Sequence, residues 1–186
     1  MKEKYFIALI PPSPIYEECL SIKEYFRDHY RSKGALRSPP HITLHMPFLW
    51  RPDRQSELVD HLKQCTEKIS PVDIVLKGFG CFAPRVIFIH VEDSEPLIQM
   101  QRQVRKYCRE ELNLLNADFR EKPFHPHMTV AFRDLKKKDF TAAWKEFGSK
   151  SFDARFRTTH ITLLKHEGQQ WKVHTNFEIP MGSAEP

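Results

Sequence analysis

The 186-residue chain lacks a long hydrophobic run and any low-complexity stretch. No apolar segment approaches the roughly 18 residues that a membrane-spanning helix needs, so we expect no membrane association. The apolar run that ends at Ile10 is too short for a signal-peptide core. It is followed by Pro11-Pro12 and not by a small-residue cleavage site, which favours a cytoplasmic protein.

Paired cysteines and a strong charge imbalance are also missing. None of the four cysteines forms a C-x-x-C pair, and their apolar surroundings favour buried, reduced thiols. Hydrophobic residues make up 40% and charged residues 28% of the chain, which excludes wholesale disorder and collagen. The formal net charge is +5, which suits a phosphate-bearing partner without requiring one. The length fits one domain or two small lobes.

The hydrophobic periodicity predicts a mixed α and β chain whose second half repeats the first. Each half contains a helix, a loop, a strand, a second helix and two further strands, and an extra strand opens the first half. The expected strands cover 4–10, 41–46, 72–81, 85–91, 127–132, 152–165 and 170–179. The expected helices cover 14–30, 54–69, 97–112 and 140–147. Residues 181–186 are expected to form a frayed tail.

The two halves share one motif. Pro40-His41-Ile42-Thr43 and Pro126-His127-Met128-Thr129 each open a predicted strand, and each continues with an aliphatic residue. Residues i and i+2 of a strand point to the same face, so each copy presents an imidazole and a hydroxyl together while its alternate residues enter the core. A single His-x-Thr carries little information, but two copies after proline, one per half, are specific.

Two imidazoles and two hydroxyls that face each other across a cleft suit phosphodiester chemistry. One neutral imidazole can take a proton from the nucleophile, and one imidazolium can give a proton to the leaving oxygen. The hydroxyls of Thr43 and Thr129 can donate to the non-bridging phosphate oxygens. We expect His127 to be the general base and His41 the general acid.

With these two motifs the chain resembles the 2H phosphoesterase superfamily, in particular its 2′-5′ RNA ligase / RNA 2′,3′-cyclic phosphodiesterase group. The resemblance implies an α+β, bilobal fold with pseudo-twofold duplication: two antiparallel sheets face a central cleft, and helices cover the outer faces. A single domain over 1–180 would take one lobe from each half of the chain. The implied activity is metal-independent hydrolysis of a nucleotide or RNA-end phosphodiester, with no cofactor and no obligatory protein partner.

Further residues are candidates for substrate binding. His45 shares a strand face with His41 if the alternation stays regular, so it is expected to line the pocket. Arg37 lies in the basic loop before the first motif, and Phe48 and Phe124 could stack on a base. Arg133 follows the second motif, and a regular strand would point it to the face opposite to His127.

A third His-x-Thr, His160-Ile161-Thr162, has no preceding proline and lies only 33 residues after His127. We expect His160 to line the cleft or face solvent without taking part in catalysis. Two other functions remain open. A zinc or iron hydrolase could use His125, His127, His41 and His45, although it would leave both threonines without a role. A catalytically inactive RNA-binding module is compatible with the net charge.

Overall fold

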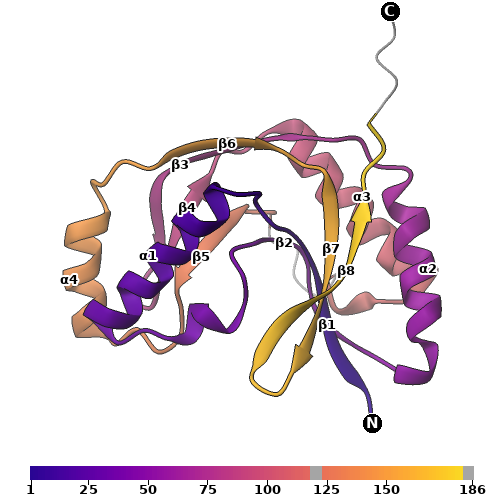
Figure 1. Cartoon of the computed structure of the whole chain (residues 1–186), viewed down its shortest axis with the longest axis horizontal. Coiled ribbons are helices and arrows are strands. Elements are labelled where there is room, and N and C mark those ends of the chain that lie inside the picture. The colour runs from indigo at the N-terminus through magenta and orange to yellow at the C-terminus, as the bar shows by residue number, and fades with distance from the viewer. Residues whose placement is uncertain (118–122, 182–186) are drawn as a thin grey trace, which may run out of the picture.

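The computed structural model describes residues 1–117 and 123–181, which form two four-stranded antiparallel sheets and four α-helices (Figure 1). Sheet A has the strand order β2 (Ile42–Trp50), β1 (Glu3–Leu9), β7 (His160–Glu167), β8 (Gln170–Glu178). Sheet B has the order β5 (His127–Ala131), β4 (Val86–Val91), β3 (Asp73–Phe82), β6 (Asp153–Arg157). The helices are α1 (Ile15–Tyr30), α2 (Gln55–Thr66), α3 (Glu95–Leu112) and α4 (Lys137–Phe147), with short 3₁₀ turns at η1 (Gly34–Arg37), η2 (Pro52–Arg54) and η3 (Leu115–Ala117).

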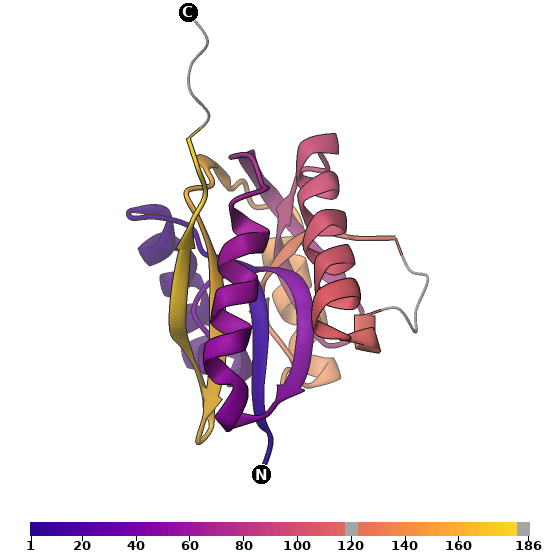
Figure 2. The ribbon, with the colours of Figure 1, turned by 90° about the vertical axis from the view of Figure 1, so that its right-hand side faces the viewer.

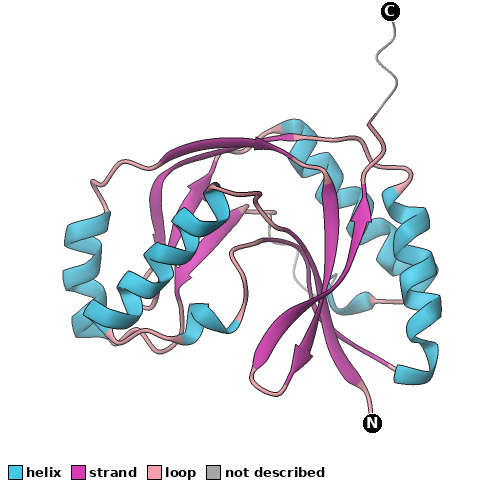
Figure 3. Cartoon of the chain, viewed as in Figure 1, coloured by secondary structure: helices cyan, strands magenta, loops and turns pink. Residues whose placement is uncertain are grey.

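The α+β class and the two antiparallel sheets are confirmed, but the expectation of one lobe per half of the chain is wrong. Strands β3 to β6 build all of sheet B, whereas sheet A combines β1 and β2 with β7 and β8. The helices cross over too: α1 packs on β5 and α4, and α3 packs on β2 and α2 (Figures 1 and 3). Each lobe therefore contains elements from both halves of the sequence.

The expected strand 152–165 is in fact two strands that belong to different sheets. The chain leaves β6 at Arg157 and enters β7 at His160, with Thr158 between them buried. Thr158 donates its backbone N–H to the carbonyl of Val72 at 2.8 Å and accepts the N–H of Val72 on its hydroxyl at 2.7 Å. These two bonds fix the crossover, and the sequence does not reveal it because no Gly, Pro, Asn or Asp separates the two strands.

Helix α3 shows how the sequence sets a helix and its buried face. Ser94 caps the first turn by accepting the N–H of Leu97, and the helix ends where Asn113 takes a left-handed conformation with φ 53°. Its apolar positions are spaced three and four residues apart and are buried: Leu97, Met100, Val104, Cys108 and Leu112. The other cysteines are free, and Cys19 and Cys65 are buried as well.

Strand β1 is apolar on both faces, which places it in the interior of sheet A. Tyr5, Ile7 and Leu9 belong to the main core under the helices, whereas Phe6 and Ala8 form a smaller cluster with Leu164 on the other face. That second face is the one that borders the cleft described below. Within the described ranges, no helix is both long and apolar enough to cross a membrane.

The two motif strands meet where the sheets adjoin. β2 and β5 are edge strands of sheets A and B, and they contact each other. Figure 2, turned by 90° from the view of Figure 1, shows α2 and α3 side by side, and α3 packs on β2. The fold thereby brings together two segments that are 86 residues apart in the sequence.

Candidate active site

Each motif histidine is held by the residue two positions before it. The Nδ1 of His41 lies 2.7 Å from the carbonyl oxygen of Pro39, and the Nδ1 of His127 lies 2.7 Å from that of His125. A carbonyl oxygen can only accept, so both rings carry their proton on Nδ1 and present Nε2 outward. The proline between the two partners fixes the backbone turn that makes this contact possible.

The third motif lacks this arrangement. His160 is exposed, and its Nδ1 lies 2.9 Å from the hydroxyl of Thr159 instead of a backbone carbonyl. Thr162 is buried and donates its hydroxyl to the side chain of Asn176. The position of His160 agrees with the expectation that it faces solvent, and this motif also lacks the preceding proline of the other two.

Aromatic rings support both imidazoles. The ring centroid of His41 lies 4.9 Å from that of Phe6 on sheet A. The centroid of His127 lies 5.1 Å from that of Phe82 and 5.2 Å from that of Phe88 on sheet B. The contacts on the two sheets are alike, as expected of a duplicated structure.

Burial keeps both imidazoles neutral at pH 7. Burial, together with the nearby Lys23 ammonium and His127, lowers the pKa of His41 to about 4. Burial also lowers the pKa of His127, although the hydrogen bond to the carbonyl of His125 opposes part of this shift. Since His127 contributes to the shift at His41, the two rings are close enough to sense each other's charge.

A cleft of about 530 Å³ opens beside these residues. Its lining includes His41 and Thr43, immediately before and within β2 of sheet A, and Thr129 from β5 in sheet B. His127 is not part of that lining, but it lies two residues before Thr129 on β5 and therefore on the same face of the strand. The remaining lining residues are Lys4, Phe6, Gly34, Ala35, Arg37, Ser38, Pro47, Phe132, Arg133, Asp134, His166 and Trp171.

The charge in the cleft is predominantly positive. Lys4, Arg37 and Arg133 bring three cationic groups to it, against one carboxylate, that of Asp134. This carboxylate accepts hydrogen bonds from the Ser32 hydroxyl at 2.8 Å and from the backbone N–H groups of residues 33 and 34 at 2.6 and 2.8 Å. Asp134 thus anchors the loop before η1, and the cations give the cleft a field that attracts anions.

The expectation that Arg133 points away from His127 is wrong. Strand β5 ends at Ala131, and Arg133 takes a left-handed conformation with φ 58° that breaks the alternation. Its guanidinium carbon lies 4.8 Å from the centroid of the Phe132 ring, and both residues line the cleft. An arginine therefore lines the cleft where regular strand geometry predicted none.

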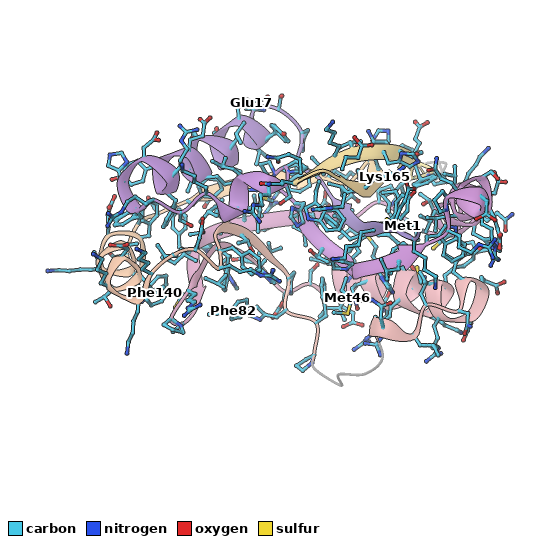
Figure 4. The ribbon with its side chains drawn as sticks, turned by 90° about the horizontal axis from the view of Figure 1, so that it is seen from below. Met1, Glu17, Met46, Phe82, Phe140 and Lys165 are labelled. Atoms are coloured by element: carbon cyan, nitrogen blue, oxygen red, sulfur yellow. The ribbon has the colours of Figure 1, made fainter. Side chains whose placement is uncertain are left out.

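Two substrate-binding candidates lie in the core instead. His45 is 1% exposed and pairs with Ile7 of the main core, because irregularities in the β1–β2 ladder on either side of this pair break the alternation that starts at His41. Phe48 is buried against Tyr5, with their ring centroids 6.2 Å apart. The exposed residue after the irregularity is Met46, which Figure 4 shows on the side of the molecule opposite to Glu17.

Of the remaining two substrate-binding candidates, one lines the cleft and the other does not. Arg37 is exposed and lines the cleft, as the sequence predicted. Phe124 packs partly on the core and borders a separate groove along the basic face of α3, so the cleft does not contain it. Sequence reasoning missed Lys4, Phe6, His166 and Trp171, since no spacing pattern marks which residues of an apolar strand face the cleft.

The described residues contain no group of three or more His, Cys, Asp or Glu side chains that could hold a metal ion. The four-imidazole set considered from the sequence is not assembled, because His45 lies in the core on the other side of β2. The residues present therefore do not fit the zinc or iron site that the alternative requires.

Residues 11–170 match the family described as the 2′-5′ RNA ligase superfamily. The chain belongs to this superfamily. A relative from Bacillus licheniformis, provisionally named a phosphoesterase, is 33% identical over 130 residues, which cover 69% of this chain and 70% of the relative. A second relative with the same provisional name, from Bacillus cytotoxicus, is 28% identical and covers 97% of this chain and 99% of its own length. Membership supports a phosphoesterase of the 2H type.

Solved structures share the fold of this superfamily member. A crystal structure of a Thermus thermophilus protein matches with a TM-score of 0.69 at 19% identity, covering 98% of this chain and all of that one. Escherichia coli LigT, crystallised with 3′-AMP, matches with a TM-score of 0.63 at 16% identity, covering 96% and 99% of the two chains. LigT has also been crystallised with ATP and with NADP⁺.

Proposed function

We propose that this superfamily member hydrolyses a 2′,3′-cyclic phosphate or a related 2′-5′ nucleotide phosphodiester without a metal, by two-histidine acid/base catalysis. The observation that carries the proposal is the matched pair of Nδ1–carbonyl bonds at His41 and His127, which leaves both Nε2 atoms available beside a cationic cleft. The LigT complexes with nucleotides support a nucleotide substrate.

The reaction needs one imidazole that accepts a proton and one that donates. A water molecule attacks phosphorus while one Nε2 takes its proton, and the new P–O bond replaces the bond to the 2′ or 3′ oxygen of the ribose. The other Nε2 protonates that departing oxygen, which gives a nucleoside monophosphate. Phosphate bound nearby favours the imidazolium form of the donor.

The assignment of the two roles reverses the order expected from the sequence. The pKa depression is the larger at His41, mainly because of burial and further because the positive charge of Lys23 opposes protonation of the ring. We therefore assign His41 as the imidazole that stays neutral and acts as the base. His127 then carries the proton for the leaving oxygen. The sequence could not anticipate this order because Lys23 reaches the site from a helix of the other lobe.

The hydroxyls and cations complete the proposed mechanism. Thr43 and Thr129 line the cleft and can donate to the non-bridging oxygens. Arg37 and Arg133 also line the cleft and can neutralise charge that builds on those oxygens in the transition state.

The test is the rate of hydrolysis of nucleoside 2′,3′-cyclic phosphates by single and double variants. His41→Ala and His127→Ala should each lose roughly 10²- to 10⁴-fold in kcat, the usual contribution of one placed proton-transfer group. The double variant should lose less than the product of the two factors, because the pair acts as a unit. His160→Ala is the matched control and should retain nearly full activity. Loss of turnover in His160→Ala with full activity in His41→Ala would refute the pairing.

Two further measurements separate this proposal from the alternatives. Activity that disappears with a chelator and returns with added zinc would favour a metallohydrolase. Binding of 2′,3′-cyclic nucleotides without any turnover would favour an RNA-binding module that has lost catalysis.

A further inference from the structure

A row of aromatic rings leads from the catalytic histidine of sheet A along one wall of the cleft. Beyond His41 it consists of Phe6, Trp171 and His166, which we call the aromatic shelf. The centroid of Phe6 lies 4.9 Å from that of His41 and 4.7 Å from that of Trp171, and the centroid of Trp171 lies 4.8 Å from that of His166. The proposed catalytic mechanism uses none of these three rings.

The shelf has a buried base and an accessible outer part. Phe6 is 3% exposed and belongs to the small apolar cluster on the cleft face of sheet A. Trp171 and His166 are only half-buried, although they line the cleft on the paired strands β7 and β8. Large aromatic surface that remains accessible in a cleft with charged lining residues is a place where a flat partner gains stacking energy.

Neighbouring groups hold the shelf in place and charge its surroundings. The Gln170 side chain, with its amide oriented to donate, reaches the carbonyl oxygens of Leu36 and Arg37 at 3.2 and 3.1 Å. This ties the β7–β8 turn to η1 beside the first motif. Arg37 and Lys4 line the same cleft, so an anionic group next to the stacked partner meets positive charge.

From this arrangement we infer that the aromatic shelf is a nucleobase subsite, on which the base of the substrate stacks against Trp171 while its phosphodiester lies at His41. The inference rests on the proposed function. A nucleoside phosphodiester fits because it carries a flat aromatic base and an anionic phosphodiester in one molecule. The base can contact the aromatic shelf while the anion lies in the adjoining cationic cleft. Stacking tolerates every base, since each has a π face, so the subsite distinguishes nucleotides from base-free phosphodiesters more than one base from another.

The experiment compares two substrates with each variant. One is adenosine 2′,3′-cyclic phosphate, and the other is methyl riboside 2,3-cyclic phosphate, which has no base. Stacking on one aromatic side chain is worth about 1–3 kcal/mol, so Trp171→Ala should lower kcat/KM for the nucleotide by roughly 5- to 150-fold, chiefly through KM. The base-free substrate should be hydrolysed by this variant as by the wild type. Trp171→Phe should retain most of the nucleotide activity.

Lys172→Ala is the matched control, because Lys172 neighbours Trp171 on β8 but is exposed outside the cleft and pairs with Glu167. It should behave as the wild type with both substrates. Equal losses on the two substrates in Trp171→Ala, or no loss on the nucleotide, would overturn the subsite. If Trp171→Ala does not fold, Trp171→Leu provides the same comparison.

Direct binding separates failure of the subsite from failure of the proposed function. The chain has three tryptophans, and 3′-AMP stacked on Trp171 should quench part of the fluorescence. That quenching should disappear in Trp171→Phe, whose remaining tryptophans are unchanged. Quenching without turnover of either substrate would refute the hydrolase but keep the subsite. Turnover of both substrates with equal efficiency and no quenching would refute the subsite alone.

Discussion

Lys23 is a buried cation in α1 whose removal should change both stability and catalysis. The side chain is 1% exposed, and its Nζ donates to the carbonyl oxygens of Ala35 and Ser38 at 3.0 Å each. It thus holds the loop that leads into Pro39, whose carbonyl orients His41. The informative change is Lys23→Met, which keeps an unbranched stem and removes the charge.

The effect on stability depends on pH in a defined direction. Burial lowers the pKa of Lys23 from 10.5 to about 7, so between these values the unfolded chain binds one proton that the folded chain does not. The free energy of unfolding therefore rises with pH in this window, and the cost of the buried charge is fully present below pH 7. From pH 7 to pH 9 this one group should add about 2 kcal/mol of stability, given 1.36 kcal/mol per pKa unit.

The measurement is urea unfolding of the wild type and of Lys23→Met at pH 7, 8 and 9. Buried thiols and tyrosines also titrate at high pH, but they are common to both proteins and largely cancel in the difference. The wild type should gain about 2 kcal/mol relative to the variant across the series. At pH 7 the variant loses two hydrogen bonds, which costs about 1–3 kcal/mol for each carbonyl left unsatisfied. It also no longer buries a charge, which is stabilising, so the net change in its free energy of unfolding should be small.

Catalysis gives an independent readout of the same residue. Near pH 4 Lys23 is charged, and its charge opposes protonation of His41. In Lys23→Met the pKa of His41 should rise, so the ascending limb of kcat/KM should move to higher pH. A stability difference that stays constant from pH 7 to 9, or an ascending limb that does not move, would refute this account of Lys23.

Two further predictions concern the site as a whole. The pH profile of kcat/KM should be bell-shaped, because one imidazole must be neutral while the other is charged. Its ascending limb should lie near pH 4 from His41, and its descending limb below pH 6.5 from His127. A maximum above pH 7 would contradict the assigned roles. Gly34→Ala should destabilise the protein by about 1–3 kcal/mol and lower kcat/KM, because a Cβ at Gly34 would lie 2.5 Å from the backbone oxygen of Phe132. An unchanged midpoint of urea unfolding would show instead that the loop can move away.

The sequence predicted the helices and most strands because their apolar periodicity is regular. It also singled out His41 and His127 as site candidates, because the duplicated Pro-His-x-Thr is a local pattern, and the structure gives both rings the same contact with a backbone carbonyl. It failed at His45 and Arg133, where an irregular ladder and a left-handed residue break the alternation on which the predictions relied. Trp171 and Lys23 join the site through tertiary contacts between distant elements, which no local pattern encodes.

The division of the chain between the two sheets has a consequence for its synthesis on the ribosome. Sheet B is built entirely from one continuous part of the chain, so it can form while later residues are still being made. Sheet A needs β7 and β8 to join β1 and β2, which are separated from them by more than half of the sequence. Both motif histidines therefore emerge before Trp171, and a nascent chain that already contains His41 and His127 still lacks part of the cleft lining.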